Sequence, residues 1–266
     1  MHRLFLVAAM LLFGMASTSA QNAVSADVMK DLAPTGKVRA AINLGNMVLA
    51  QKDAATGQPK GITPELATEL GKRLGVPVEF VIFDSAGKVF DANKNSAWDI
   101  AFLAVEPVRA AEIEFTAPYV IIDGTYLVRA DSPLKTVADL DRDGMRIAVN
   151  HGAAYDLYLS RMLKHASLVR ADGGTRALMD AFAKDKLDAV AGVRQALDAA
   201  AKGRSDVRVM DDKFMEIRQA MGAPKGRIAG ARYLSAFVED MKASGFVADA
   251  LKRSNQSAAV APPAAK

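Results

Sequence analysis

Short apolar runs rich in β-branched residues alternate with amphipathic helical patterns along most of the chain. The helical pattern is clearest at Leu66, Leu70 and Leu74, which recur every four residues before Gly75 ends the run. Because strands separated by helices pair in parallel, this alternation predicts an α/β fold with mostly parallel sheets. The predicted strands are residues 38–42, 78–83, 99–104, 146–149, 168–170, 187–191 and 207–210, and the main predicted helices are residues 64–74, 153–164, 175–185, 230–244 and one from residue 246.

The first twenty residues have the pattern of a secretory signal peptide. Basic His2 and Arg3 precede an apolar run at residues 4–15, and small residues at 16–20 precede polar Gln21. The apolar run is too short to span a bilayer, although a buried N-terminal helix is the alternative interpretation. We therefore predict cleavage near Ala20, export, and a periplasmic location for the remaining chain of about 245 residues.

The composition excludes several classes of function. The chain has no cysteine, which excludes disulfides, thiolate metal sites, a cysteine nucleophile and a lipid anchor on cysteine. Basic and acidic residues are interleaved and the formal net charge is +4, which favours a solvated surface over a nucleic-acid-binding one. Residues 254–266 are mostly Ala, Pro and Ser, and we predict a disordered tail there.

Motifs for common enzyme chemistry are missing from the sequence. After cleavage only His151 and His165 remain as histidines, and their spacing does not suit a metal ion. The chain has no P-loop, no Gly-x-Gly-x-x-Gly fingerprint and no Gly-x-Ser-x-Gly nucleophile elbow. We therefore predict no metal site, no cofactor and no catalytic residue.

Four segments carry a family resemblance. After the strand at 99–104 the chain reads Glu106-Pro-Val-Arg109 and then Phe115-Thr-Ala-Pro-Tyr119. The other three are residues 61–80 (Gly-Ile-Thr-Pro-Glu-Leu-Ala followed by Leu-Gly-Val-Pro-Val-Glu-Phe), residues 134–152 (Leu-Lys-Thr-Val-Ala-Asp-Leu followed by Arg-Ile-Ala-Val-Asn-His-Gly) and residues 186–190 (Lys-Leu-Asp-Ala-Val). Their order and spacing resemble the extracellular solute-binding proteins of family 3, the polar amino-acid binders of ABC importers, over residues 36–253.

The resemblance implies a type II periplasmic binding fold, with two α/β lobes joined by a hinge of two segments. Lobe 1 would comprise residues 27–123 and 223–253, and lobe 2 would comprise residues 124–222, which include the hinge crossings. The first crossing is expected near residues 124–128 and the return near residues 219–222. Closure of the lobes about such a hinge would enclose a ligand.

The resemblance also implies the binding residues. In the family the position of Arg109 holds the α-carboxylate of the substrate, and a planar guanidinium can do so with two parallel bonds. The alternative is a surface arginine paired with Glu106 or Glu112. The loop after the strand at 146–149 would supply backbone N–H groups to the same anion at Gly152, Ala153 and Ala154, with Tyr155 as an additional polar contact.

Several expected contacts differ from the family pattern. The chain has neutral Asn43 and Asn46 after the first strand, Ala104 at the end of the third, and Glu106 in place of a threonine. Phe102 of the third strand is expected in the core, with an edge that can reach the cleft. Val193 replaces the lobe 2 aspartate that pairs with a substrate ammonium group, and Arg194 follows it. Either Glu106 holds the ammonium group or the ligand has no α-amino group, and we favour the second interpretation.

The resulting expectation is a monomeric, non-enzymatic solute-binding protein. It would capture a small carboxylate-bearing molecule, an amino acid or an organic acid, and deliver it to the membrane permease and ATPase of an ABC importer. One alternative is a periplasmic dehydratase-like enzyme for a cyclic carboxylic acid, with Glu106 as general acid. Another is a sensing role, in which the closed form docks on a receptor.

Overall fold

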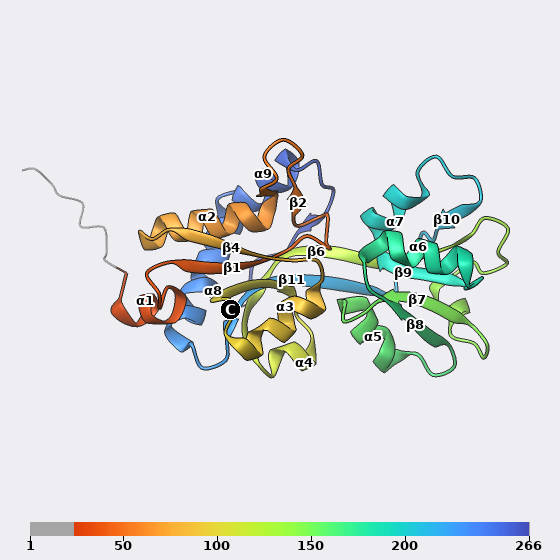
Figure 1. The fold of residues 1–266 in the computed structure, drawn as a ribbon, viewed down its shortest axis with the longest axis horizontal. Helices are drawn as coiled ribbons and strands as arrows, with labels where there is room; N and C mark the ends of the chain where they lie inside the picture. Colours follow the sequence, from red (N-terminus) through yellow and green to blue (C-terminus); the bar gives the residue numbers. More distant parts are fainter. Residues whose placement is uncertain (1–23, 266) are drawn as a thin grey trace, which may run out of the picture.

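The computed structural model describes residues 24–265, which form two lobes along one continuous sheet (Figure 1). The sheet has ten strands, and its main path runs β4-β1-β5-β11-β6-β9-β7-β8. The predicted signal peptide at residues 1–20 lies outside the described residues. Among the residues described, no helix is both long enough and apolar enough to cross a membrane.

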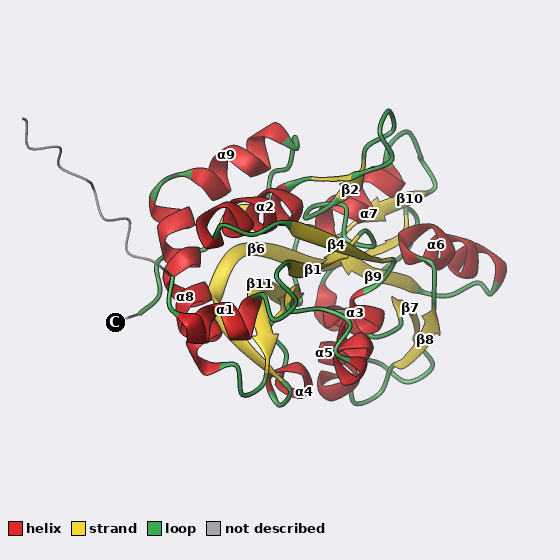
Figure 2. Ribbon diagram, turned by 60° about the vertical axis from the view of Figure 1, so that its left-hand side comes forward, coloured by secondary structure: helices red, strands yellow, loops and turns green. Residues whose placement is uncertain are grey.

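Lobe 1 has three parallel strands, β4, β1 and β5, with β11 antiparallel beside β5, and helices cover both faces of this sheet (Figure 2). Every residue of β5 is buried, whereas β4, at the edge of the sheet, has no buried residue. Ala40 and Ile42 of β1 pack into one apolar cluster, whereas Ala41 packs with Val89 and Trp98 on the opposite face. The elements are α1 (Ala26–Leu32), β1 (Val38–Asn43), α2 (Ile62–Leu74), β4 (Val78–Phe83), α3 (Ala86–Ala92), β5 (Ile100–Ala104), α4 (Pro107–Ala110), α8 (Ile228–Ala243) and α9 (Phe246–Arg253).

Lobe 2 repeats this architecture on a smaller scale. Three parallel strands in the order β9-β7-β8 lie between α5 on one side and α6 and α7 on the other (Figure 1). The elements are η2 (Val137–Leu140), β7 (Arg146–Asn150), α5 (Ala154–Met162), β8 (Ser167–Ala171), α6 (Gly174–Lys184), β9 (Ala189–Val193), α7 (Arg194–Ala201) and β10 (Val207–Val209). Short elements of lobe 1 are η1 (Asn93–Asn95) and the hairpin of β2 (Gln51–Lys52) and β3 (Pro59–Lys60).

Two long strands, β6 (Ile113–Arg129) and β11 (Met215–Pro224), connect the lobes. They are antiparallel, and β6 pairs with β11 from Ile113 to Gly124 and then with β9 from Gly124 to Val128. Gly124 is therefore the point at which β6 passes from lobe 1 to lobe 2, at the edge of the predicted first crossing.

The return crossing lies earlier in the chain than predicted. Residues 219–222 of β11 pair with β5 and so belong to the lobe 1 sheet. The part of β11 that leaves β5 and pairs along β6 toward lobe 2 is residues 215–218. The family resemblance placed the return at residues 219–222, whereas Ala220 and Gly222 are strand residues packed inside lobe 1.

The tail predicted to be disordered is ordered over the part that the structure describes. Strand β12 (Ala259–Val260) pairs antiparallel with Ile121 and Val120 of β6, and the Ala261 N–H donates to the Tyr119 carbonyl at 3.0 Å. Lys242 Nζ donates to the carbonyl of Pro262 at 2.9 Å. Composition predicted disorder because the segment is low in complexity and has no periodic pattern, but an unpaired strand edge needs only backbone groups to bind it.

A buried carboxylate joins the two chain segments of lobe 1. Asp99 is fully buried, and its oxygens accept from Arg39 Nε at 2.9 Å, Arg39 Nη2 at 2.8 Å and Arg227 Nη1 at 3.0 Å. Burial raises the pKa of Asp99, but the hydrogen bonds from the two arginines outweigh it and hold the pKa below its usual value. Asp99 and the two arginines therefore link β1 to the start of α8. With α8 the chain returns to lobe 1 after it has passed through lobe 2.

We expect Asp99→Asn to lower the free energy of unfolding by about 3 kcal/mol at neutral pH, because it leaves two arginines without their carboxylate. The pKa of Asp99 is depressed in the folded state, so its contribution is complete above the unfolded value of about 3.9 and is lost as the pH falls through the folded pKa. Urea titrations of both proteins from pH 7 to pH 3 measure the difference, which should shrink below about pH 4.

The exposed pair of Arg204 and Asp206 supplies the control for this measurement. Asp206→Asn should change the free energy of unfolding by less than about 1 kcal/mol at any pH in that range. A difference between wild type and Asp99→Asn that stays constant down to pH 3 would contradict the assigned role.

Candidate functional site

A cavity of about 60 Å³ lies where the two lobes meet. Four of its lining residues are the last residues of strands: Asn43 of β1, Ala104 of β5, Asn150 of β7 and Val193 of β9. Carboxyl ends of parallel strands are where open α/β sheets bind ligands, and here the ends from both lobes face one space. The remaining lining residues are Gly45, Asn46, Met47, Ser85, Ala86, Phe102, Leu103, Arg109, Ala153, Ala154, Tyr155, Gly174, Thr175, Ala196, Ile217 and Gln219.

Arg109 is the central charged residue of this cavity. Its side chain, on the short helix α4 directly after β5, is only 1% exposed. Nη1 donates to the Ala104 carbonyl at 3.1 Å and Nη2 donates to the Gly152 carbonyl of lobe 2 at 2.8 Å, whereas Nε has no partner among the described residues. Burial lowers the pKa of Arg109 to about 10, against the opposing effect of nearby Glu106, so the side chain is cationic at neutral pH. The alternative of an exposed arginine paired with an acid is wrong.

Three helices of lobe 2 begin at the cavity. Ala153 precedes α5, Gly174 is the first residue of α6, and Val193 precedes α7. None of these three helices has a side chain bonded to its N-terminal N–H groups among the residues described. Uncapped N-termini carry partial positive charge and free donors, so lobe 2 favours an anion at the same place as Arg109 does.

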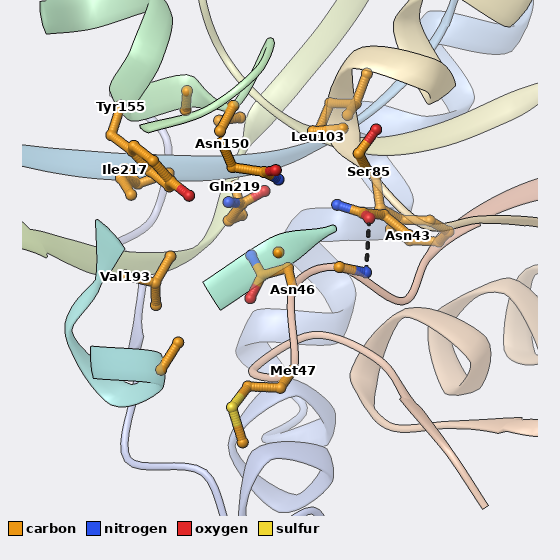
Figure 3. A pocket seen from close by; sticks show the side chains of 18 of the residues that line it. Asn43, Asn46, Met47, Ser85, Leu103, Asn150, Tyr155, Val193, Ile217 and Gln219 are labelled. Atoms are coloured by element: carbon orange, nitrogen blue, oxygen red, sulfur yellow. Dashed lines mark hydrogen bonds between the residues drawn. The ribbon is translucent and has the colours of Figure 1, made fainter. Parts of the chain in front are cut away.

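The polar side chains of lobe 1 present donors. Asn43 Oδ1 accepts from the Gly45 N–H at 2.9 Å and Asn46 Oδ1 accepts from the Val48 N–H at 3.2 Å. Ser85 Oγ accepts from the Lys88 N–H at 3.3 Å at the start of α3. Because these oxygens are engaged by the backbone, the amide nitrogens and the hydroxyl hydrogen remain for a ligand. Figure 3 shows the side chains of Asn43 and Asn46 directed toward the space shared with Asn150 and Gln219.

Charge in the cavity is one-sided. Among the described residues that line it, Arg109 carries a positive charge and none is an aspartate or glutamate. Tyr155 is buried, which raises the pKa of its phenol and keeps it neutral, although a hydrogen bond with the Asn150 backbone opposes this shift. Residues 24–265 also contain no group of three His, Asp or Glu side chains placed to hold a metal ion. The arrangement suits an anionic ligand rather than a cationic one.

The structure brings most of the predicted site residues together. Asn43, Asn46, Phe102, Ala104, Arg109, Ala153, Ala154, Tyr155 and Val193 all line the cavity. Their contact with a ligand stays a prediction.

Glu106 does not line the cavity. Its carboxylate is 4% exposed, and Oε2 lies 2.7 Å from Arg161 Nη2 of α5 in lobe 2, an ion pair whose angles do not meet those of a hydrogen bond. The pair joins the two lobes. It also places the carboxylate outside the space where Glu106 was expected to meet a substrate ammonium group.

Gly152 and Arg194 also lie outside the cavity lining. The Gly152 N–H donates to Asp156 Oδ2 at 2.9 Å, and its carbonyl accepts from Arg109. The guanidinium of Arg194 donates to the carbonyls of Met210 at 2.9 Å, Asp211 at 2.9 Å and Asp212 at 3.1 Å. Arg194 therefore fixes the segment before β11 and adds no direct positive contact to the site.

Sequence reasoning missed several lining residues. Ser85 follows a predicted strand, so the rule that ligands bind at carboxyl ends would have found it. Asn150 begins the loop that was expected at the site, but it was not predicted as a contact. Thr175 begins a predicted helix. Ile217 and Gln219 lie on β11, which gave no clear strand signal, and only the sheet order places them at the cavity.

Comparisons with known proteins agree on a fold. A family model described as bacterial extracellular solute-binding proteins, family 3, matches residues 48–255. A mutant of ArgBP from T. maritima matches with a TM-score of 0.72 and 20% identity, over 85% of this chain and 98% of that one. A solute receptor for L-cysteine of Neisseria gonorrhoeae matches with a TM-score of 0.72 and 22% identity, over 83% of this chain and 90% of that one.

One further match is an ancestral binding protein described as the precursor of an enzyme. The ancestral amino acid-binding protein AncCDT-1, a precursor of cyclohexadienyl dehydratase, matches with a TM-score of 0.71 and 22% identity, over 85% of this chain and 97% of that one. At such identities these likenesses show the fold, which is the type II periplasmic binding fold.

We expect Glu106→Gln to shift the protein without added ligand toward a more open arrangement of the lobes. The substitution removes the charge that attracts Arg161 across the cleft, while it preserves the shape of the buried side chain. Small-angle scattering should show a larger radius of gyration than for wild type.

Glu114→Gln is the matched control, because Glu114 pairs with Lys225 at 3.2 Å within lobe 1. This variant should leave the radius of gyration unchanged. An equal radius of gyration for Glu106→Gln and wild type would show that the ion pair does not influence closure.

Proposed function

Because the chain belongs to family 3 of the bacterial extracellular solute-binding proteins, we propose that it captures a small carboxylate between its lobes and delivers it to the permease and ATPase of an ABC importer. The periplasm is the compartment in which such a delivery takes place, and the signal-peptide pattern at residues 1–20 agrees with it. The similar ArgBP and L-cysteine receptor bind amino acids according to their names.

The buried guanidinium of Arg109 carries this proposal. A charged group that is almost fully buried and bonded to two carbonyls has lost much of its hydration without gaining a counter-charge in contact. A ligand carboxylate would supply that charge and would also accept from Nε. The uncapped N-termini of α5, α6 and α7 would stabilise the same negative charge from lobe 2.

The lining residues favour a carboxylate without an α-ammonium group. An ammonium group in a closed cavity needs anionic or several neutral acceptors, and Val193 offers none. Glu106 is the acid that sequence analysis left as a substitute, but Arg161 already holds its carboxylate away from the cavity. The ligand class is therefore an organic acid rather than an ordinary amino acid.

Binding is favoured over catalysis by the same geometry. The similarity to AncCDT-1 supports a dehydratase-like enzyme as the alternative function. Such an activity needs an acid in the cleft. Glu106 was the candidate acid, and it lies outside the cavity lining. A sensing role would use the same closed form and differs only in the membrane partner. Neighbouring genes that encode a permease and an ATPase would favour the transport role over the sensing role.

We expect Arg109→Ala to weaken binding of an organic-acid ligand by about 2–5 kcal/mol, because the ligand carboxylate loses its charged partner. A thermal-shift screen of organic acids and amino acids identifies ligands, and isothermal titration calorimetry of the best one compares wild type with the variant. Arg218→Ala is the control, since Arg218 lies on β11 with a mostly exposed side chain. Near-native affinity in folded Arg109→Ala would overturn the proposal.

We also expect a deaminated acid to bind more tightly than the amino acid of the same carbon skeleton, because the cavity has no partner for the ammonium charge. Calorimetric titration of such matched pairs tests this, and the preference should persist in Glu106→Gln. Tighter binding of the amino acid, lost in Glu106→Gln, would restore an amino-acid ligand and give Glu106 the role of ammonium partner.

A further inference from the structure

Asn150 lines the cavity with a buried acceptor. It is the last residue of β7 and is 6% exposed, and its Oδ1 has no hydrogen-bond partner among the described residues. Figure 3 shows its side chain directed into the space that it shares with Gln219 and Asn43. A buried amide oxygen without a partner is costly, and native structures contain few of them.

The buried polar atoms that lack a hydrogen-bond partner in the cavity indicate which groups a ligand must supply. Among the described residues that line it, two side chains have a buried polar atom without a partner: Arg109 at Nε and Asn150 at Oδ1. The first is a charged donor and the second is a neutral acceptor. The complementary molecule has an anionic acceptor at one place and an N–H or O–H donor at another.

A hydroxyl group fits the second requirement better than an ammonium group does. An ammonium group brings a full positive charge and three donors into a lining that has Arg109 and three uncapped helix N-termini. A hydroxyl brings one donor and no charge, and its oxygen can accept from the amide nitrogens of Asn43 and Asn46, whose oxygens are already engaged. The number of donors and the sign of the charge therefore both favour a hydroxyl group over an ammonium group.

The size of the cavity restricts the ligand further. The cavity of about 60 Å³ favours a small molecule over a large one. The shortest 2-hydroxy acids are among the smallest molecules that carry both a carboxylate and a hydroxyl group.

We propose that the ligand is a small hydroxycarboxylate, held through its carboxylate by Arg109 and recognised through its hydroxyl group by Asn150 Oδ1. The inference rests on the proposed function and specifies the ligand class of the same site. Because Arg109 belongs to lobe 1 and Asn150 to lobe 2, such a molecule connects the lobes with both of its polar groups. Recognition of the hydroxyl is thereby coupled to closure.

The test uses three series of acids that differ in one group. Glycolate, lactate and 2-hydroxybutyrate, with both enantiomers of the last two, are compared with acetate, propionate and butyrate and with glycine, alanine and 2-aminobutyrate. Calorimetric titration of the wild-type protein should show that the best hydroxy acid binds about tenfold to a hundredfold more tightly than its deoxy counterpart, and the amino acid least tightly.

Two substitutions assign the effect to Asn150. Asn150→Leu keeps the approximate size but removes the acceptor, so it should reduce the affinity for the hydroxy acid to that for the deoxy acid. Asn150→Asp supplies a carboxylate and should raise the affinity for the amino acid. Asn93→Leu is the control, because Asn93 also has an unpaired buried Oδ1 but lies outside the cavity lining. Thermal unfolding verifies that each variant folds.

The outcomes separate this inference from the proposed function. If the wild-type protein binds deoxy acids as tightly as hydroxy acids, and Arg109→Ala abolishes both, the hydroxycarboxylate inference is wrong and the carboxylate site stands. If no acid of the three series binds while the thermal-shift screen finds another carboxylate that requires Arg109, the hydroxycarboxylate inference is wrong and the proposed function stands. If the Asn150 variants do not fold, the selectivity of the wild-type protein alone decides.

Discussion

The burial of one guanidinium determines how the two lobes and the ligand site depend on each other. Arg109 donates to the Ala104 carbonyl of its own lobe and to the Gly152 carbonyl of the other, so the closed arrangement removes the side chain from water. Carbonyl oxygens satisfy two of its nitrogens but do not neutralise its charge. This arrangement of the lobes therefore encloses a positive charge and favours an anion beside it.

The sign of the site depends on where the nearest acid is held. Glu106 is three residues before Arg109 and is itself buried, and a carboxylate in the cavity would cancel the charge that attracts an anion. Arg161 of lobe 2 prevents this, because it pairs with Glu106 outside the cavity lining. The same contact holds the lobes together, so the electrostatics of the site and the closure of the cleft have a common cause.

The sequence predicted the parts of the site that depend on local chain geometry. The family resemblance placed Asn43, Ala104 and Val193 in the site, and the structure places them at strand ends that line the cavity. The directions of Glu106 and Arg194 were not predictable, because their partners lie far along the chain, at Arg161 and at the carbonyls of residues 210–212. The sequence analysis did not predict the position of β11 or that the C-terminal tail is ordered. Both are fixed by pairing with β6, a tertiary contact that no local sequence pattern contains.

Pairing along β6 also determines where the molecule can bend. One edge of β6 pairs with β12 at Val120 and Ile121 and with β9 from Gly124 onward, which leaves Ile122 and Asp123 unpaired on that edge within the described sheet. Bending that keeps the other pairs intact is therefore concentrated at these two residues and at their partners on β11, Ile217 and Glu216. Since Ile217 lines the cavity, a hinge at these residues would be part of the ligand site, and a ligand packed against it would oppose reopening of the lobes.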